Sequence, residues 1–458
     1  MKRLFLSKTS HLITKFLISI LLISFISTVV KAQEVYDLNR SILTGLEQNF
    51  SIKVTRNQEE ITGNNYTRGN AGFLPTVTTI NRFGGNLTST TQNMNDGNKN
   101  TSNGIQNTTG SAAVNLNMTL FQGFNVQTTY QKLNELKQVG EINTQMAIEN
   151  LVAQIVAEYY SLIQQHNYFD NMQYAVSLSK ERVRIDEERY LLGASSKMEL
   201  LQSVVYLNAD SSRLARQNEV ILESEIRLKK LMSLENLEEN IVLKDTSIVF
   251  NPDLIYKDLL VSTLDLNTGL QIAKKNQIIS ELDYKIIASR TYPYLNFSSG
   301  YNYSYRGYET GTISDYGALA INNQQSHAMN YNLALGLDLF DGFNRKREKT
   351  NAHIEIENRN IQYREVEQEV KADLLTIYYA YENNLRLLRL EEQNLEVARE
   401  NLEIALERYK LGNLAGLELR EVQKSLLDAE ERLISVKYLT KLAEISLLHI
   451  SGRIMDYM

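Results

Sequence analysis

The chain of 458 residues carries the hexapeptide LFQGFN at residues 120–125 and the near copy LFDGFN at residues 339–344, an offset of 219. The same offset relates three more matches, which are Tyr159-Tyr160 with Tyr378-Tyr379, Glu188–Gly193 with Glu407–Gly412, and Glu199-Leu200 with Glu418-Leu419. Pro75 and Pro293 correspond at an offset of 218. Self-similarity at one spacing over about 80 residues marks an internal repeat. The sequence therefore predicts a tandem duplication.

Both halves predict the same order of elements. A helical segment, at 38–72 and again at 262–290, ends at a proline, and two strands separated by a polar loop follow. A very long helix, a glycine turn and a shorter returning helix complete each half, at 124–190 and 197–233, then at 344–409 and 416–450. The expected organisation is a first repeat at 33–234, a link at 235–261, a second repeat at 262–452 and a short tail at 453–458.

The predicted strands alternate between apolar and polar side chains. In residues 329–339 the apolar positions are Met329, Tyr331, Leu333, Leu335, Leu337 and Leu339, and 295–305 and 112–120 behave alike. The strand at 76–85 is weakly patterned, and the stretch 86–110, with seven Asn and six Thr, predicts a solvated surface loop. One apolar and one polar face is typical of a strand between lipid and water. The alternative, a soluble sandwich, needs more than two strands per half.

The long helices carry a heptad pattern. The first has apolar or aromatic positions in steps of four and three, at Ile148, Val152, Ile155, Tyr159, Leu162, His166 and Phe169. The second continues the pattern at Leu374, Tyr378, Tyr381, Leu385 and Leu388, then at Leu395, Leu402, Leu406 and Tyr409. This pattern predicts coiled-coil packing, and about 65 helical residues extend roughly 100 Å. The predicted fold class is thus a mixed α/β membrane protein with long antiparallel helices, beside which the shorter helices stack end to end.

The composition excludes several functions. The chain has no Cys, so thiol chemistry, disulfides and Cys-based zinc sites are ruled out. With 48 basic and 54 acidic residues, the chain lacks the excess of positive charge that is typical of nucleic-acid-binding proteins. No His pair has metal-ligand spacing, and no phosphate loop or Ser nucleophile motif is present. His166 corresponds to Leu385 and is interpreted as part of the helix seam. We therefore expect neither an enzyme nor a cofactor or metal site.

The N-terminus predicts export. Basic residues from Lys2 to Lys15 precede the apolar stretch 16–30, and Val30-Lys31-Ala32 is an acceptable cleavage site. Residues 1–32 are therefore interpreted as a signal peptide, with a retained membrane anchor as the alternative. No later stretch has the 18 or more apolar residues of a spanning helix, so a membrane-spanning part must be a closed barrel.

The strand number implies more than one copy. Four strands cannot close a barrel, because the smallest transmembrane barrels have eight. Two copies would give eight strands and a barrel filled by side chains, whereas three would give twelve and leave room for water.

The sequence resembles the TolC-like outer-membrane efflux protein family, also called outer membrane factors. The resemblance covers residues 36–452. It rests on the Leu-Phe-(Gln/Asp)-Gly junctions with Gly123 and Gly342, on Pro75 and Pro293 before the strands, and on the paired Arg-Tyr-x-x-Gly turns. It implies a homotrimer with a shared twelve-stranded barrel in outer-membrane lipid and a periplasmic helical tunnel. It also implies a periplasmic adaptor protein and an inner-membrane pump of the RND or ABC type, with drugs, other small molecules or proteins as cargo.

The resemblance also implies sites at the hairpin turns. Tyr190, Gly193, Tyr409 and Gly412 would form the periplasmic tip on which the adaptor docks. The alternative is ordinary helix-turn chemistry without a partner.

Acidic side chains beyond the turns correspond to a pore constriction in the family. Glu418 and Glu421 lie three residues apart on one helical face, and the first half keeps only Glu199, with Gln202 at the second position. A ring of such carboxylates would attract cations. The alternative is a solvated helix face.

The resemblance further implies that Tyr409 bonds to Glu199 when the tip is closed. Some members of the family have an arginine where this chain has Leu414, so a second closing contact is not expected in the same form.

Three readings therefore compete: an export channel, a periplasmic coiled-coil scaffold without a pore, and a general diffusion porin. Porins lack long helices, which disfavours the third interpretation. Rows of outward-facing Leu and Tyr side chains are not expected on a sheet in water, which disfavours the second. The export channel is therefore preferred. The cargo, the energy source of the pump and the open or closed state of the tip are not specified by the sequence.

Overall fold

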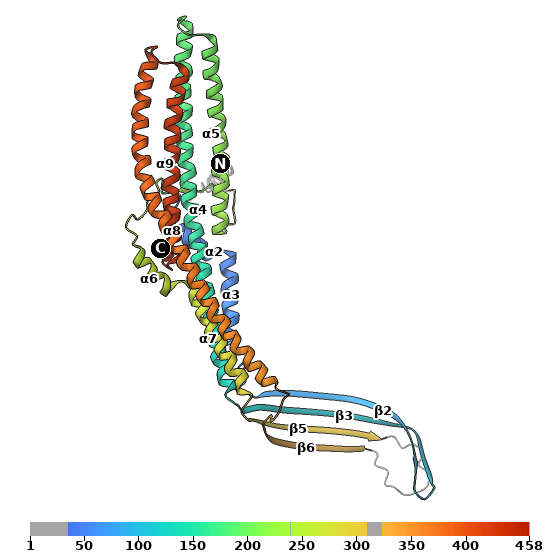
Figure 1. Ribbon diagram of the computed structural model, residues 1–458. Coiled ribbons are helices and arrows are strands. Elements are labelled where there is room, and N and C mark those ends of the chain that lie inside the picture. Colours follow the sequence, from blue (N-terminus) through green and yellow to red (C-terminus); the bar gives the residue numbers. More distant parts are fainter. Residues whose placement is uncertain (1–34, 239, 309–322, 458) are drawn as a thin grey trace, which may run out of the picture.

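The protein, described here from a computed structural model, is defined at residues 35–238, 240–308 and 323–457. The predicted signal peptide at 1–32 lies outside these described residues. The helices run along one long axis, and a single large sheet leaves that axis at one end (Figure 1). Two helical hairpins form the opposite end, which we call the tip.

The two long helices are α4 (Asn125–Leu191) and α8 (Asn344–Lys410), each of 67 residues. They return as α5 (Lys197–Met232) and α9 (Gly416–Ile450). The predicted bounds of all four helices are confirmed to within one residue. Long uninterrupted helices form here because no proline occurs between residues 76 and 251 or after 293.

The predicted helices at 38–72 and 262–290 are wrong as single helices. The first is α2 (Leu38–Gln48) followed by α3 (Phe50–Asn65), and the second is α6 (Tyr256–Leu266) followed by α7 (Thr268–Ser289). Each break falls on an asparagine, Asn49 or Asn267. Helix α6 also begins within the stretch that was expected to be the link.

The two asparagines explain both breaks. The side chain of Asn49 accepts from the amides of α3 and donates to the carbonyl of Leu231, near the end of α5, over 2.9 Å. The side chain of Asn267 caps α7 and donates to the carbonyl of Ile450, at the end of α9, over 3.0 Å. An asparagine N-cap satisfies amides that a helix start leaves free. Each asparagine therefore also ties a short helix to the end of the helix stacked above it.

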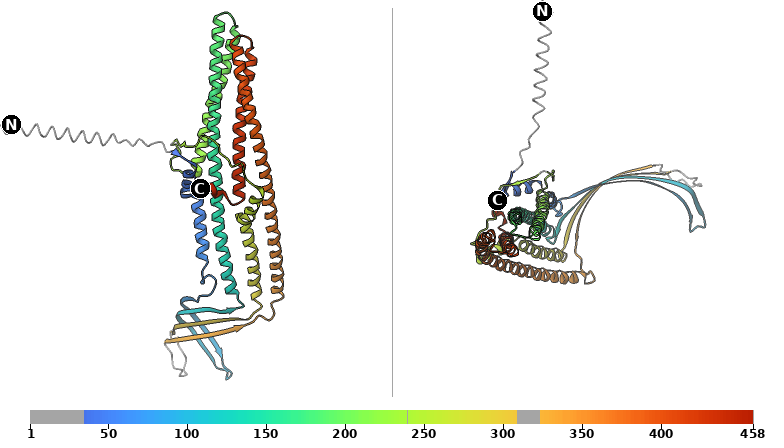
Figure 2. Two further views of the ribbon diagram at one scale, coloured as in Figure 1. Left: turned by 90° about the vertical axis from the view of Figure 1, so that its left-hand side faces the viewer. Right: turned by 90° about the horizontal axis from the view of Figure 1, so that it is seen from above.

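The sheet has the order β2-β3-β5-β6, with every neighbouring pair antiparallel. Its strands are β2 (Thr76–Asn93), β3 (Lys99–Gln122), β5 (Tyr294–Tyr308) and β6 (Asn323–Gly336). The pair β3 and β5 joins the two halves of the chain. Seen along the helix axis, the sheet is an open curved arc to one side of the helices (Figure 2). Among the described residues, β2 and β6 each pair on one side only.

Two strand predictions are corrected. The stretch 86–110, expected to be a solvated loop, lies mostly in β2 and β3, and only 94–98 form the turn between them. Most of the Asn and Thr side chains that are described in this stretch are exposed, but the backbone is paired as far as Asn93 with Lys99. At the other end, β6 stops at Gly336, so Leu337 and Leu339 lie beyond the strand. A Cβ at Gly336 would overlap the ring of Tyr294.

Short elements close the middle of the molecule. The strands β1 (Val35–Tyr36) and β4 (Val242–Leu243) pair in parallel, and the 3-10 helix η1 (Ile454–Tyr457) ends the described chain. None of the helices in the described ranges combines the length and the apolar character needed to cross a membrane.

The heptad seam is confirmed in α8. Its positions at steps of seven are all buried: Leu374, Tyr381, Leu388, Leu395, Leu402 and Tyr409. In α4 the seam is confirmed from Val152 to Leu162, but His166 is exposed, which corrects its interpretation as a seam residue. The buried face of α4 turns at this level, because α4 then also packs on α9, where Asn171 donates to the carbonyl of Leu427 over 3.2 Å.

Candidate functional site at the tip and the strand-helix junctions

The turn between α4 and α5 ends the long helix in a Schellman motif. The amide of Gly193 donates to the carbonyl of Tyr190 over 3.0 Å, and the amide of Ala194 donates to that of Arg189 over 2.8 Å. Gly193 has a φ of 72°, a left-handed conformation that a Cβ would strain. The Arg-Tyr-x-x-Gly pattern is therefore the chemistry of a helix end.

The turn between α8 and α9 repeats this geometry. Gly412 has a φ of 77°, and its amide donates to the carbonyl of Tyr409 over 3.0 Å. The amide of Asn413 donates to the carbonyl of Arg408 over 2.9 Å. The side chains differ, since Tyr190 is 40% exposed and Tyr409 only 2%. Docking of a partner on these turns stays a prediction.

The predicted glutamates lie at the starts of the returning helices. The amide of Glu199 donates to Ser196 Oγ over 3.3 Å, and its carboxylate accepts from Ser195. Glu418 has the matching place in α9, Glu421 follows one turn later, and both are exposed. Acidic residues in a first turn are favoured by the helix dipole, which gives Glu199 and Glu418 a local role. Their gathering into a ring stays a prediction.

Within the chain, Tyr409 bonds to a carboxylate other than that of Glu199, and the contact with Glu199 in a closed tip stays a prediction. The hydroxyl of Tyr409 donates to the carboxylate of Asp186 in α4, and both side chains are buried. Burial, together with this hydrogen bond, raises the pKa of Tyr409 to about 12. Arg189 lies over the ring of Tyr409, 5.1 Å from its centroid. The contact ties the first hairpin to the second.

Leu414 replaces the arginine of some family members with an apolar contact. It is partly buried against the cluster of Ile185, Tyr409 and Leu419. The turn is thus packed at this position, whereas an arginine would bring a charge.

Arg182 places a second charge beside Asp186. Its Nε lies 3.7 Å from Asp186 Oδ2, and its guanidinium lies over the ring of Tyr206 in α5, 5.2 Å from the centroid. Arg182 is buried, yet its Nε and one terminal nitrogen have no hydrogen-bond partner among the described residues, nor has Asp186 Oδ2. Buried ionised groups that lack full hydrogen bonding destabilise the arrangement that holds them.

A bidentate ion pair completes the contact between the hairpins. Arg420 of α9 donates both terminal nitrogens to Asp210 of α5, at 2.9 Å each, and Ser179 of α4 donates to the same carboxylate over 2.5 Å. Arg420 also lies 5.0 Å from the centroid of the Tyr206 ring. The tip network, defined as Arg182, Asp186, Tyr206, Asp210, Tyr409 and Arg420, therefore connects all four helices of the tip.

Sequence reasoning found only Tyr409 of this network. A signal was present, because the offset of 219 pairs Asp186 with Ala405 and Asp210 with Ala429. Both alanines are buried. A carboxylate where the other half buries an alanine indicates a polar contact that only one half makes.

The strand-helix junctions repeat their geometry as predicted from the hexapeptides. Gly123 and Gly342 have φ values of 56° and 66°, and the following residues, Phe124 and Phe343, have 67° and 66°. The ring of Phe124 packs edge-on against that of Phe121, with 5.3 Å between the ring centroids. Phe343 packs on Phe340 in the same way, with 5.4 Å between the centroids. Pro75 and Pro293 lie directly before β2 and β5.

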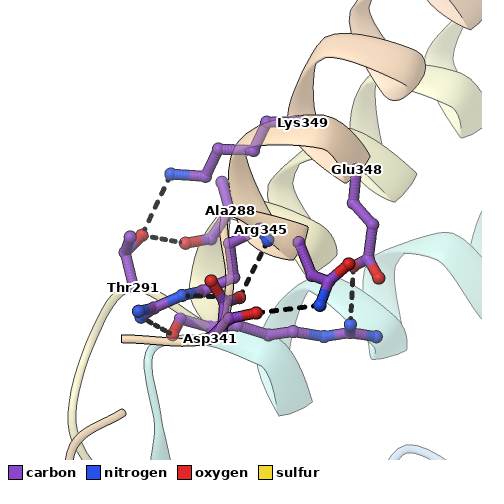
Figure 3. A network of polar contacts seen from close by, with 8 residues as sticks. Ala288, Thr291, Asp341, Arg345, Glu348 and Lys349 are labelled. Carbon is purple, nitrogen blue, oxygen red and sulfur yellow. Dashed lines mark hydrogen bonds and ion pairs between the residues drawn. The ribbon is translucent and has the colours of Figure 1, made fainter. Parts of the chain in front are cut away.

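The junction of the second half is reinforced by ionic contacts (Figure 3). Asp341 Oδ2 accepts from the amide and the Nε of Arg345, at 2.8 and 3.1 Å. Lys349 donates to Thr291 over 3.2 Å, and Arg290 pairs with Glu348 at 2.8 Å. These contacts fix the start of α8 to the end of α7, and so set the direction in which the sheet leaves the helices.

The described part of the chain holds no group of three or more His, Asp or Glu side chains arranged to hold a metal ion.

The comparisons with known proteins agree with this architecture. Residues 259–453 match the family model of outer membrane efflux proteins. The second half of the chain is therefore similar to this family over the matched residues. No curated protein matches the chain.

Over nearly its whole length the chain has the fold of solved outer-membrane proteins and channels. VceC, an outer membrane protein from Vibrio cholerae, matches with a TM-score of 0.74 and 16% identity, over 91% of this chain and 96% of that chain. The CmeC outer membrane channel from Campylobacter jejuni matches with a TM-score of 0.73 and 16% identity, over 91% and 85%. The outer-membrane channel OprN matches with a TM-score of 0.72 and 15% identity, over 91% and 89%. The predicted resemblance to outer-membrane efflux proteins is confirmed.

Proposed function

We propose that this protein is a passive export channel of the outer membrane, formed by three identical chains. The observation that carries the proposal is the four-stranded sheet. It exposes Leu and Tyr side chains on one face, leaves β2 and β6 unpaired on their outer sides among the described residues, and joins helices about 100 Å long.

The free strand edges support assembly with further copies. An exposed edge of 14 or 18 residues invites pairing with another chain, and pairing β6 of one copy with β2 of the next would close the sheet. Three copies would contribute twelve strands and leave a water-filled interior, whereas two would give an eight-stranded barrel filled by side chains.

The helices would continue the pore through the periplasm. In this arrangement the two hairpins of each copy surround a duct, and the turns at Gly193 and Gly412 form its far end. A periplasmic adaptor protein would dock there and connect the duct to an inner-membrane pump of the RND or ABC type. Such a channel conducts drugs, other small molecules or proteins without recognising them, because the pump selects the cargo.

The alternative is a periplasmic coiled-coil scaffold without a pore. The row of exposed apolar side chains on β6, at Met329, Tyr331, Leu333 and Leu335, disfavours it. A large exposed apolar patch on a sheet in water promotes aggregation.

The test is the native mass of the protein purified in detergent from the outer-membrane fraction. We expect a particle of three chains that is recovered with the membrane. A soluble monomer or dimer would reject the channel and leave the scaffold.

A further inference from the structure

A groove of about 570 Å³ lies at the junction of β6 with α8. Its lining combines exposed apolar side chains with cationic ones. Leu339, Phe340 and Phe343 are 87%, 72% and 70% exposed, and Lys346 and Lys349 line the same groove. Apolar surface next to ammonium groups is the combination found where acyl chains meet lipid headgroups.

The position of the groove fits such a boundary. The exposed apolar row of β6 continues beyond the strand through Leu337 and Leu339 to Phe340 and Phe343. The first basic residue follows directly at the start of α8. If the sheet lies in lipid, as the proposed function requires, this point is the periplasmic surface of the membrane.

The basic residues are placed where the helix itself disfavours them. The first turns of α8 hold Arg345, Lys346, Arg347 and Lys349, and no acidic residue occurs in its first turn. Cations near a helix N-terminus are repelled by the helix dipole. Arg345 is compensated by Asp341, but the ammonium of Lys346 forms no hydrogen bond or ion pair with the residues that the structure describes. An anion bound in the groove would offset this repulsion.

The acidic side chains described at the groove do not pair with Lys346 or Lys349, so these two ammonium groups can bind an anion. Asp341 is engaged by Arg345 through two contacts, and Lys349 reaches Thr291 from the other side (Figure 3). Asp338 also lines the groove and is exposed. Lys346 and Lys349 therefore remain as donors to a phosphate, and Asp338 could accept from an ammonium of a zwitterionic headgroup.

The first half of the chain lacks this feature. At the offset of 219, Arg345, Lys346, Arg347 and Lys349 correspond to Val126, Gln127, Thr128 and Tyr130. The strand-helix turn has the same backbone geometry in both halves, so the turn itself does not require the basic residues. Arg345 and Lys349 already have contacts at the junction, whereas the ammonium of Lys346 has none with the residues that the structure describes.

We propose that this groove binds a phospholipid of the membrane's periplasmic leaflet. Lys346 and Lys349 hold the phosphate of the headgroup, and the acyl chains lie against Leu339, Phe340 and Phe343. This inference rests on the proposed function, because it requires the sheet to lie in a membrane.

The test is native mass spectrometry of the detergent-solubilised protein titrated with phosphatidylethanolamine. The double variant Lys346→Gln/Lys349→Gln removes both ammonium groups, and Gln is the residue that the first half has at the position of Lys346. We expect about fivefold weaker lipid binding for each lysine removed. Lys371→Gln, which removes a lysine paired with Glu367 further along α8, should bind lipid as the wild type does.

The outcomes separate the sources of the phosphate and the two proposals. Binding of inorganic phosphate alone with the affinity of the lipid would overturn the lipid assignment. Unchanged lipid binding by a trimeric double variant would reject the site and leave the channel standing. Loss of the trimer in the double variant alone would assign the groove to a neighbouring copy. A wild-type protein that is neither trimeric nor membrane-bound would reject the channel itself.

Discussion

At the scale of single residues, the buried carboxylate of Asp186 links the two hairpins of the tip. Asp186 accepts from Tyr409 and lies beside Arg182, and all three side chains are buried. The hydrogen bond crosses between the hairpins, so this carboxylate acts on their separation and not on the stability of either helix alone.

Replacing Asp186 with Asn should loosen the tip. The change removes the charge that compensates buried Arg182 and should destabilise the contact by about 3 kcal/mol. Hydrogen exchange of the amides near 186 and 409 measures the effect, which we expect as faster exchange at the tip and unchanged exchange at Leu374. Asp170→Asn, an exposed position on the same helix, serves as the control. Equal exchange rates in the two variants would show that Asp186 does not stabilise the contact between the hairpins.

Tyr409 should give the tip a dependence on alkaline pH. Its pKa is raised to about 12 in the folded protein, above the usual value of 10, so folding favours the protonated hydroxyl. This stabilisation is fully present below pH 10 and is lost as the pH rises towards 12. In alkaline titrations of tyrosinate absorbance, Tyr409→Phe should remove one late-titrating group. The difference in unfolding free energy between wild type and variant should shrink over that range, and a constant difference would contradict the assignment.

At the scale of elements, the ends of helices and strands decide the shape. The two glycines of the strand-helix junctions both have positive φ, but their surroundings differ. A Cβ at Gly123 would overlap the carbonyl oxygen of Ser289 in α7, whereas a Cβ at Gly342 would meet only the Asn344 side chain, at 3.8 Å.

Alanine at the two junctions should therefore have unequal effects. Gly342→Ala adds backbone strain of about 1 kcal/mol, and Gly123→Ala adds the same strain and a steric overlap with backbone. Thermal unfolding of the detergent-solubilised protein should show a small decrease of Tm for Gly342→Ala and a much larger one, or loss of folded protein, for Gly123→Ala. Equal decreases would mean that α7 moves away without cost.

The side chains of Asn49 and Asn267, at the two helix breaks, should stabilise the stacked helices. Asn49→Ala or Asn267→Ala removes an N-cap and one hydrogen bond to the neighbouring helix end, and each should cost about 1–2 kcal/mol. Because the two sites lie in separate helix stacks, the double variant should lose the sum of the two effects. Denaturant unfolding measures this. A much smaller loss in either variant would show that packing alone holds that junction.

At the scale of the whole molecule, the proposed pore places charge at its narrow end. Glu418 and Glu421 are exposed on one face of α9, and three copies would bring six carboxylates together. A ring of carboxylates raises the local concentration of cations.

Glu418→Gln/Glu421→Gln should lower the cation selectivity of the channel in planar bilayers. Removing six charges from a constriction lowers the attraction for cations, and block by divalent cations should weaken with it. Glu403→Gln/Glu407→Gln, on the exposed surface of α8, provides a matched loss of charge. A selectivity equal to that of the control would place Glu418 and Glu421 on a solvated outer face.

The sequence predicted the parts of the fold that follow from local patterns. The heptads located α8 and its buried positions, the hexapeptides located both junctions, and the Arg-Tyr-x-x-Gly motifs located both tip turns. It misjudged 86–110, because a Thr- and Asn-rich composition reports solvation and not whether the backbone is paired. It missed the helix breaks at Asn49 and Asn267, because those asparagines act on helix ends about 180 residues away in the chain.

Periodicity and the repeat by themselves determined the order and length of the long helices and the buried face of α8, since these depend on the chain's own regular spacing. The partner of Tyr409 was decided only by the tertiary structure. Within the chain it is Asp186 and not Glu199, because helices from the two halves meet at the tip with a particular rotation. A pattern within one helix fixes which face is buried, but the side chain met by that face depends on how two helices are packed together.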